Sequence, residues 1–401
     1  MLIGHFPFRP APQMPRSGIA LPPPVLFPVP MSVAPMTASP LRITLAPPPG
    51  IAALETRWRT LEAASDASFF QSWTWVGCLL ERRFPRPVLL AAEQDGQTVA
   101  LALLNRAGPA WEPERLFLGE NGDPTLDAVY VEHNGPLLAH GRTDLLPACL
   151  NALLHRPIAP RRRRAGRRLT LSGVDAALLQ AARAAGAVRL CRSSPAPFID
   201  FAGLADGEPA FLASLSGNTR YQLRRSDRRY AAAGPIAVRR AASVEEALGF
   251  LDALAPLHQA TWTARGRPGS FANADFVRFH RALIARGLPR GEVDLLRIAA
   301  GAQVIGYLYN FIFRGRVLSY QSGFDYAAAD AHQKPGLTCH GAAIALYRAE
   351  GAASYDFLAG EDRYKTSLSN ASAMLHWLEA APRASLRGLA FAAQAQLRAA
   401  G

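Results

Sequence analysis

A chain of 401 residues that is 49% hydrophobic and 19% charged has the composition of a soluble globular protein with room for two domains. Its formal net charge of +13 fits either an anionic partner or a general preference for arginine, and no basic stretch carries the interleaved aromatics of a single-strand-binding surface. No apolar run is long enough for a membrane span. The cysteines form neither a zinc pattern nor a disulfide framework, so we expect free thiols in a cytoplasmic protein; they are Cys78, Cys149, Cys191 and Cys339.

The first half of the chain predicts an α/β unit. Residues 1–40 are rich in proline, which excludes the helical core of a signal peptide, and we expect a disordered tail there. The patterned sequence then predicts strands at 41–47, 87–94, 97–107, 114–120, 168–173 and 187–192, with helices at 50–64, 143–155 and 174–185. Asp95-Gly96 marks a hairpin turn. Six arginines within 161–168 fit a solvated loop or a binding patch, and 193–201 reads as a linker.

The second half predicts helices around an antiparallel meander. Helices are expected at 209–234, 243–266, 274–286 and 336–350, and strands at 236–241, 292–300, 304–313, 316–324, 354–360 and 373–380. Strand 316–324, helix 336–350 and strand 354–360 form a parallel crossover. The first of these helices carries a basic face, because its arginines recur at helical spacing; they are Arg220, Arg224, Arg225, Arg228 and Arg229.

The chemistry is expected where that crossover begins. Of the 44 basic residues only two are lysines, Lys334 and Lys365, and they flank the crossover. Helix 336–350 starts after Pro335, so its free N–H groups and the compact charge of Lys334 suit an anion. An ordinary capped helix with a surface lysine explains the same residues, and the residues alone leave both interpretations open. P-loop, dinucleotide-binding, zinc-protease and nucleophile-elbow motifs are absent, which weighs against those four activities.

Several segments of the second half carry a family resemblance. "LHQATWTARGRPGSF", "GYLYNF", "YQSGFD", "KPGL" and "YDFLAGEDRYKTSL" resemble GNAT-related acyltransferases of the CelD type, which are associated with cellulose and exopolysaccharide biosynthesis, and more distantly the Fem peptidyltransferases. "FFQSWTWVGCLLE" and "LFLGE" in the first half resemble the N-terminal half of the same proteins more weakly. The chain departs from the usual GNAT pyrophosphate loop, because "HQKPGL" stands in its place.

The resemblance implies an α+β fold of tandem GNAT-like domains, each a mixed, mostly antiparallel sheet flanked by helices. The implied division is a tail at 1–40, a degenerate GNAT-like domain at 41–198, the acyltransferase domain at 199–385 and a C-terminal helix or tail at 386–401. Strands 316–324 and 354–360 would splay apart, leaving a notch for the pantetheine of acetyl-CoA or another acyl-CoA. No metal is implied. The donor-binding residues on this view are Tyr320, Gln321, Gln333, Lys334 and Gly336.

The resemblance also suggests roles for residues near the acceptor. His258 is the first candidate base, since its ordinary pKa is close to neutral, although a lone helical histidine is more often structural. Asp356 could be a carboxylate with a raised pKa or could fix a neighbouring arginine. Tyr364 and Lys365 could meet the acceptor or the leaving thiolate. Trp262 and Phe271 are expected to form core or the wall of the acceptor pocket. Arg265 and Arg267 are expected to contact an anionic acceptor.

Three functions remain open from the sequence. The first is acyl-CoA-dependent transfer to the amine of a sugar, a polysaccharide precursor or another small molecule. The second is Fem-like transfer from aminoacyl-tRNA, with the basic face at 220–229 on the acceptor stem. The third is a catalytically inactive GNAT-like scaffold in polysaccharide biosynthesis, which would use the arginines of 161–168 to contact anionic polymer or lipid.

Overall fold

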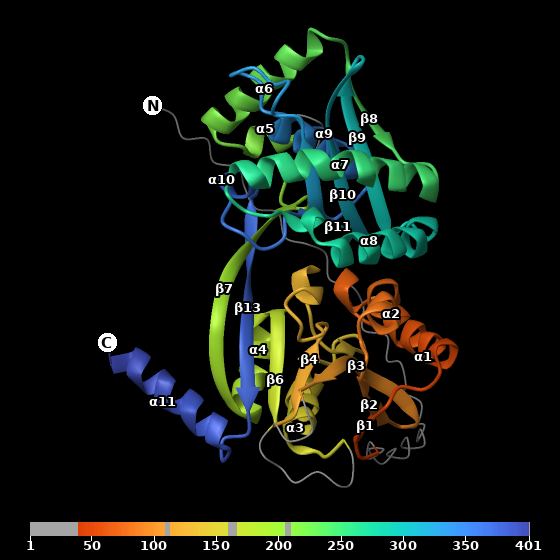
Figure 1. The fold of residues 1–401 in the computed structure, drawn as a ribbon, viewed down its shortest axis with the longest axis vertical. Helices are drawn as coiled ribbons and strands as arrows, with labels where there is room; N and C mark the ends of the chain where they lie inside the picture. The colour runs from red at the N-terminus through yellow and green to blue at the C-terminus, as the bar shows by residue number, and fades with distance from the viewer. Residues whose placement is uncertain (1–38, 109–112, 159–166, 205–209, 401) are drawn as a thin grey trace, which may run out of the picture. The chain divides into compact units, whose positions relative to one another are not determined.

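The N-terminal half places two helices and a hairpin before an alternating series of strands and helices. The structure is a computed structural model that describes residues 39–108, 113–158, 167–204 and 210–400 (Figure 1). The elements of this half are β1 (Arg42–Ala46), α1 (Ile51–Ala63), η1 (Phe69–Gln71), α2 (Trp73–Arg82), β2 (Pro87–Gln94), β3 (Gln97–Ala107), β4 (Arg115–Leu118), η2 (Leu126–Ala128), β5 (Leu137–Leu138), η3 (Thr143–Leu145), α3 (Leu146–His155), β6 (Arg168–Val174), α4 (Ala176–Ala185) and β7 (Ala187–Asp200).

The C-terminal half has the predicted meander and crossover, with one short helix that the sequence did not predict, α10. Its elements are α5 (Ala210–Ser214), α6 (Gly217–Ala231), β8 (Ile236–Arg240), α7 (Val244–Ala264), η4 (Ser270–Ala272), α8 (Ala274–Gly287), η5 (Leu288–Arg290), β9 (Val293–Ala300), β10 (Gln303–Phe313), β11 (Arg316–Phe324), α9 (Pro335–Ala349), β12 (Ser354–Asp356), α10 (Arg363–Leu368), β13 (Ala371–Ala381) and α11 (Leu386–Ala400).

One continuous sheet runs through both halves. Its strand order is β1-β2-β3-β4-β6-β13-β7-β12-β11-β10-β9-β8, and β5 pairs with β3. The meander β9-β10-β11 is antiparallel as predicted, and β11 pairs with β12 in parallel. The sheet is therefore mixed and mostly antiparallel, with helices on its faces (Figure 1).

The two halves are joined by the ribbon of β7 and β13. These strands pair antiparallel from Ala187–Ala381 to Phe198–Ala371, and β13 also pairs with β6. The prediction of a linker at 193–201 is therefore wrong, since β7 continues as a strand to Asp200. Two prolines are tolerated in that stretch. Each proline lacks an N–H donor, but its carbonyl can still accept a hydrogen bond.

The predicted helix at 209–234 is also wrong in part, because the chain breaks into α5 and α6. Ser216 is the N-cap of α6 and its side chain accepts a hydrogen bond from the backbone N–H of Thr219. Ser and Thr at such positions satisfy the free donors of a helix start, so "LSGNT" begins a new helix instead of continuing the old one. The basic face lies on α6, and Arg229 pairs with Asp330.

A hydrophobic core is shared between the halves. Trp75 and Phe70 of the first half contact Phe311 and Tyr320 of the second, with ring centroids 6.0–6.4 Å apart. Burial of such rings provides much of the apolar area that stabilises a fold. Two further clusters lie under α3 and α4 and around α9.

In the first half, residues 129–135 fill the place beside the end of β6, where β4 stops. The backbone N–H of Asn134 donates to Gly173 O (3.0 Å) and its side chain donates to Leu118 O (2.9 Å), so it joins both strands. A side chain at position 173 would lie 2.5 Å from the carbonyl oxygen of Val131, and Gly173 has φ +64°. This plugging segment, as we call residues 129–135, closes the notch between β4 and β6.

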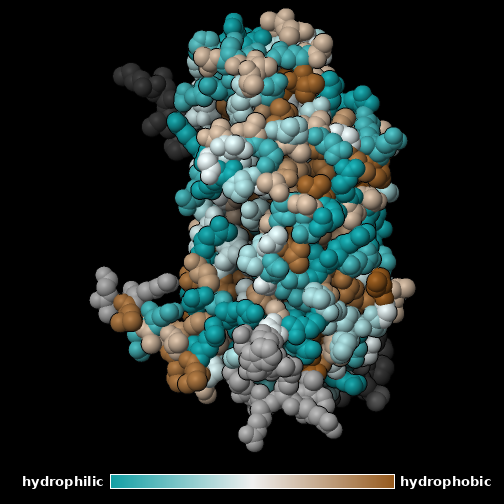
Figure 2. All heavy atoms as spheres, in the orientation of Figure 1, coloured by the Kyte–Doolittle hydropathy of each residue, from teal (hydrophilic) through white to brown (hydrophobic). Residues whose placement is uncertain are grey.

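The C-terminal helix α11 follows β13 and is mostly exposed. Phe391 is buried, whereas Leu386, Leu389 and Leu397 are exposed. Figure 2 shows hydrophobic surface in brown on the projecting arm at lower left, where Figure 1 places α11. No helix in the described part of the chain is long and apolar enough to cross a membrane. The tail predicted at 1–40 falls almost wholly on residues 1–38, outside the described residues, as do positions 161–166 of the arginine run. Arg167 and Arg168, its last members, pair with Glu114 and Glu379.

Candidate functional site

Strands β11 and β12 separate after a short stretch of pairing. Only Arg316, Val317 and Leu318 of β11 face Ser354, Tyr355 and Asp356 of β12, whereas β11 continues to Phe324. Beyond Leu318, the edge of β11 that faces β12 therefore has no strand partner among the described residues, whereas its other edge stays paired with β10. Two parallel strands that diverge leave backbone groups open to a ligand, as the predicted notch requires.

The segment that follows β12 turns away from β11, because it forms hydrogen bonds with β7 instead. The N–H groups of Phe357 and Gly360 donate to the carbonyls of Pro197 and Pro195, at 3.0 and 2.9 Å. Between them Leu358 adopts φ +60°, a left-handed conformation that strains a residue with a side chain. The strain is held in place by the Asp356 carboxylate, which accepts the Leu358 N–H at 2.7 Å.

A cleft of about 670 Å³ opens at this divergence. Nine of the twelve predicted site residues line it: Tyr320, Gln321, Lys334, Gly336, His258, Trp262, Arg265, Tyr364 and Lys365. Both lysines of the chain are therefore in one cleft. Arg267 lines it as well, and the Arg265 and Arg267 guanidinium groups lie 5.5 and 5.9 Å from the centre of the Trp262 ring.

The start of α9 offers free donors to this cleft. Lys334 is the N-cap, and Pro335 at the first position has no N–H to satisfy. The N–H groups of Gly336 and Leu337 have no hydrogen-bond partner among the described residues, and both residues line the cleft. The Lys334 side chain is exposed and donates to Ala331 O at 3.2 Å. This arrangement suits an anionic group.

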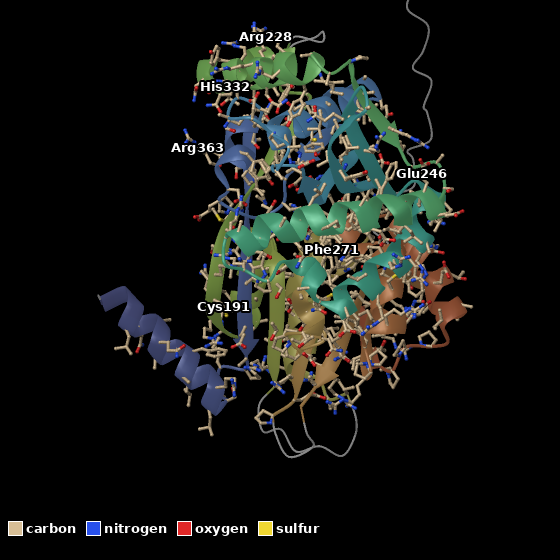
Figure 3. All side chains as sticks on the ribbon, turned by 45° about the horizontal axis from the view of Figure 1, so that its top comes forward. Cys191, Arg228, Glu246, Phe271, His332 and Arg363 are labelled. Carbon is tan, nitrogen blue, oxygen red and sulfur yellow. The ribbon has the colours of Figure 1, made fainter. Side chains whose placement is uncertain are left out.

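Helix α6 holds the start of α9 in position. The buried Ser226 hydroxyl accepts the Lys334 N–H at 2.8 Å and lies 2.8 Å from Thr338 Oγ1. The Thr338 hydroxyl donates to Asp227 at 2.8 Å. Arg229 of the basic face pairs with Asp330 in the loop before α9, and Figure 3 labels Arg228 on the same helix and His332 in that loop. One arginine of the basic face therefore contacts the loop that leads into the donor end of the cleft.

His258 is held between three elements. Its Nδ1 lies 3.1 Å from Ser322 O, a group that can only accept, so Nδ1 carries the proton. Its Nε2 then accepts the Ser270 N–H at a long 3.4 Å. Burial lowers the pKa of His258, which keeps the imidazole neutral. The residue joins α7, β11 and η4, and its role as a base stays a prediction.

Lys365 and Glu132 meet at the inner end of the cleft, beside the strained turn. The Lys365 ammonium donates to the carbonyls of Leu358 (3.3 Å) and Ala359 (2.8 Å), and the Glu132 carboxylate accepts the Ala359 N–H. Burial lowers the pKa of Lys365, and the Glu132 carboxylate opposes this shift. Burial raises the pKa of Glu132. Both residues line the cleft and are 9% exposed.

Two tyrosines form apolar walls with a polar tip. Tyr320 packs on Phe311 (centroids 4.6 Å apart), and its hydroxyl has no hydrogen-bond partner among the described residues. Tyr364 stacks on the buried His340 at 5.3 Å. Burial raises the pKa of both hydroxyls, so each stays protonated and can donate.

Three predicted site residues do not reach the cleft. Asp356 is fully buried, with its carboxylate 3.0 Å from His133 Nε2 and 3.6 Å from Arg316. Its ion pair with Arg316 is compatible with the alternative in which it fixes a neighbouring arginine, and that role stays a prediction. Gln333 instead bonds with Asp330 in its own loop. Phe271 packs against the His258 ring near the start of α8 (Figure 3).

Sequence reasoning missed three cleft residues that come from the first half of the chain. Tyr130 and Glu132 belong to the plugging segment, and Arg192 comes from β7, where it stacks 3.7 Å above Trp377. No local motif marks these positions, because they are far from the cleft along the chain. In the described residues no cluster of His, Cys, Asp and Glu could hold a metal ion.

Comparisons with known proteins identify the class of this fold. Residues 217–366 match the family described as Acetyltransferase (GNAT) domain. A comparison with curated proteins finds no match. Among solved structures, FemX is similar with 11% identity and a TM-score of 0.56, covering 81% of this chain and 95% of that chain. L-PGS from Bacillus licheniformis also matches, with 10% identity, a TM-score of 0.48, and coverage of 88% of this chain and 96% of that chain. A tandem GNAT protein from the clavulanic acid biosynthesis pathway matches with 11% identity, a TM-score of 0.44, and coverage of 85% of this chain and 98% of that chain.

The predicted fold class is thereby confirmed. The chain has an α+β, GNAT-like fold, in which residues 217–366 match the GNAT domain model and the described chain is similar in fold to FemX.

Proposed function

We propose that the protein is an acyl-CoA-dependent N-acyltransferase of the CelD type, which acts in the cytoplasm on the amine of a sugar, a polysaccharide precursor or another small molecule. The observation that supports this best is the cleft itself. The open edge of β11 and the free N–H groups of Gly336 and Leu337 line one space, with Lys334 at its donor end.

The donor is expected to lie along β11 with its pyrophosphate at α9. Gly336, Leu337 and Lys334 would bind the phosphates, and Tyr320 and Gln321 would line the acyl group. The amine attacks the thioester carbonyl directly, which requires a base, donors for the oxyanion and a proton for the thiolate. Tyr364 and Lys365 are the protonated groups available at that end of the cleft.

A thiol-release assay tests this function. Acetyl-CoA is offered with a panel of amino sugars and amino acids, and we expect amine-dependent release of CoA. Lys334→Ala should weaken acetyl-CoA binding about tenfold, because it removes one charge-assisted contact worth about 1.4 kcal/mol. Arg348→Ala, at the far end of α9, is the matched control. Absence of thiol release with every amine, together with absence of acetyl-CoA binding, would overturn the proposal.

A second candidate is a Fem-like transferase that takes its aminoacyl group from tRNA. The similarity to FemX and the basic face of α6, one arginine of which contacts the loop before α9, favour it. Salt-sensitive binding of tRNA, with a steep dependence of log K on log salt, would support this candidate. A protein that binds neither acetyl-CoA nor tRNA would fit the third reading, an inactive scaffold.

A further inference from the structure

Glu132 is a buried carboxylate that the first half of the chain delivers to the cleft of the second. It belongs to the plugging segment, which closes the notch of its own half. Its Oε2 accepts the Ala359 N–H, whereas its Oε1 has no hydrogen-bond partner among the described residues. Glu132 is 9% exposed and lines the cleft, and neither of its oxygens is among the buried atoms without a partner, so the unbonded oxygen is the part that a ligand in the cleft can reach.

The surroundings of Glu132 favour a cationic or hydrogen-bond-donating ligand. The ionisable groups that face it are Lys365, His133 and Asp356, and the hydroxyl of Tyr320 is nearby. Lys365 is already engaged by two carbonyls, and His133 lies against Asp356. Among the described residues neither Lys365 nor His133 forms a hydrogen bond or an ion pair with Glu132, which leaves a place at its free oxygen for one donor from a ligand.

We propose that Glu132 binds the amine of the acceptor and takes its proton during acyl transfer. This inference rests on the proposed acyltransferase function. The acceptor ammonium gives one N–H proton to the Glu132 carboxylate, and the freed nitrogen lone pair attacks the thioester carbonyl carbon. The tetrahedral intermediate then expels the thiolate as the C–S bond breaks. The nitrogen passes its second N–H proton to the departing thiolate, and Glu132 releases its own proton to bulk water, so the products are an amide, a thiol and one proton.

Glu132 fits this role better than His258 or Asp356, the two residues that the sequence suggested as a base or as a carboxylate with a raised pKa. The pKa of Glu132 is raised by burial, which makes it a stronger base near neutral pH than an ordinary carboxylate. His258 already uses both ring nitrogens, and burial lowers its pKa. Asp356 lies outside the cleft. The first half of the chain would then complete the active site in addition to supporting it.

The test compares Glu132→Gln with the wild type in the thiol-release assay, using the amine of the panel that reacts fastest. Glutamine keeps an oxygen for the Ala359 N–H, so the fold should survive. We expect acetyl-CoA affinity within threefold of wild type and a fall in kcat of about 10²–10⁴-fold. The acidic limb of the pH–rate profile should disappear in Glu132→Gln and return in Glu132→Asp. Glu120→Gln is the control, since Glu120 is a half-buried carboxylate of the first half whose pKa is also raised by burial, and it lies outside the cleft.

The outcomes separate this inference from the function on which it rests. If Glu132→Gln turns over within threefold of wild type, or keeps its acidic limb, Glu132 is not the base and the inference fails while the acyltransferase stands. If Glu120→Gln loses as much activity as Glu132→Gln, the loss reflects buried charge in general and the inference fails too. If the wild type binds no acetyl-CoA, the proposed function falls and the inference with it.

Discussion

The two lysines are used in different ways. Lys334 is an exposed point charge at the start of α9, on a flexible stem. Lys365 is buried and donates to two carbonyls of the strained turn. The backbone of Gly360 lies close to this ammonium, because an added Cβ at Gly360 would lie 2.9 Å from it.

Gly360→Ala should therefore damage the cleft. The residue has φ +146°, and a side chain would meet the Lys365 ammonium. We expect a loss of about 1–2 kcal/mol in the free energy of unfolding and a lower rate of thiol release. Chemical denaturation measures the first quantity. Gly217→Ala is the control, since nothing lies within 4 Å of its added Cβ, and equal losses in both variants would contradict the account.

Glu120 should make stability depend on pH. Burial raises its pKa from 4.5 to about 7, so between these values the folded state binds more protons than the unfolded state. The free energy of unfolding then falls as pH rises through this window. The free energy of unfolding of Glu120→Gln, measured relative to that of the wild type, should therefore rise by about 2 kcal/mol between pH 4.5 and pH 8. Denaturation at the two pH values checks this, and an unchanged difference would contradict it.

At the scale of elements, helix α6 positions the start of α9. The Ser226 hydroxyl is the link, because it contacts both the Lys334 N–H and Thr338. Ser226→Ala should cost about 1–2 kcal/mol of stability and weaken acetyl-CoA binding severalfold, since the free N–H groups of α9 would lose their fixed direction. Calorimetry and denaturation measure the two effects.

Ser243→Ala is the control for that prediction. Ser243 caps α7 by accepting the Glu246 N–H at 3.1 Å, so its loss should cost a similar 0.5–2 kcal/mol. Ser243 does not line the cleft, and acetyl-CoA affinity should not change. Equal weakening of acetyl-CoA binding in both variants would show that α6 has no special part in the site.

The sequence was informative for elements with strong local signals. The meander was readable from apolar runs separated by tight turns, and α9 from the proline before it and the glycine after it. The break at Ser216 was missed because a capping serine inside an apolar pattern looks like a continuing helix. Strand β7 was missed beyond Arg192 because proline disfavours strands, although the carbonyls of the two prolines accept hydrogen bonds from Phe357 and Gly360, which follow β12.

At the scale of the molecule, the halves are interleaved and not simply joined. Strand β13 returns from the C-terminal half to lie between β6 and β7, and β12 pairs with β7. The cleft accordingly draws Glu132, Tyr130 and Arg192 from the first half. These positions could not be predicted from one sequence, since only the long-range pairing brings residue 132 beside residue 365.

This interleaving predicts that the C-terminal half does not fold alone. A fragment of residues 202–401 lacks β7, so β12 and β13 lose their antiparallel partner and expose an apolar edge. We expect it to aggregate or to give poorly dispersed NMR spectra. Residues 39–401, which form one compact unit, are the control and should fold. A cooperatively unfolding 202–401 fragment that binds acetyl-CoA would refute the prediction.

Hydrogen exchange with and without acetyl-CoA tests the central claim most directly, because the proposed ligand contacts are backbone N–H groups. Peptides that cover 319–322 and 336–338 should exchange more slowly when acetyl-CoA is bound, whereas peptides of α3 and α4 should not change. Protection confined to other segments, or no protection at saturating acetyl-CoA, would show that the space between β11 and β12 does not hold the thioester.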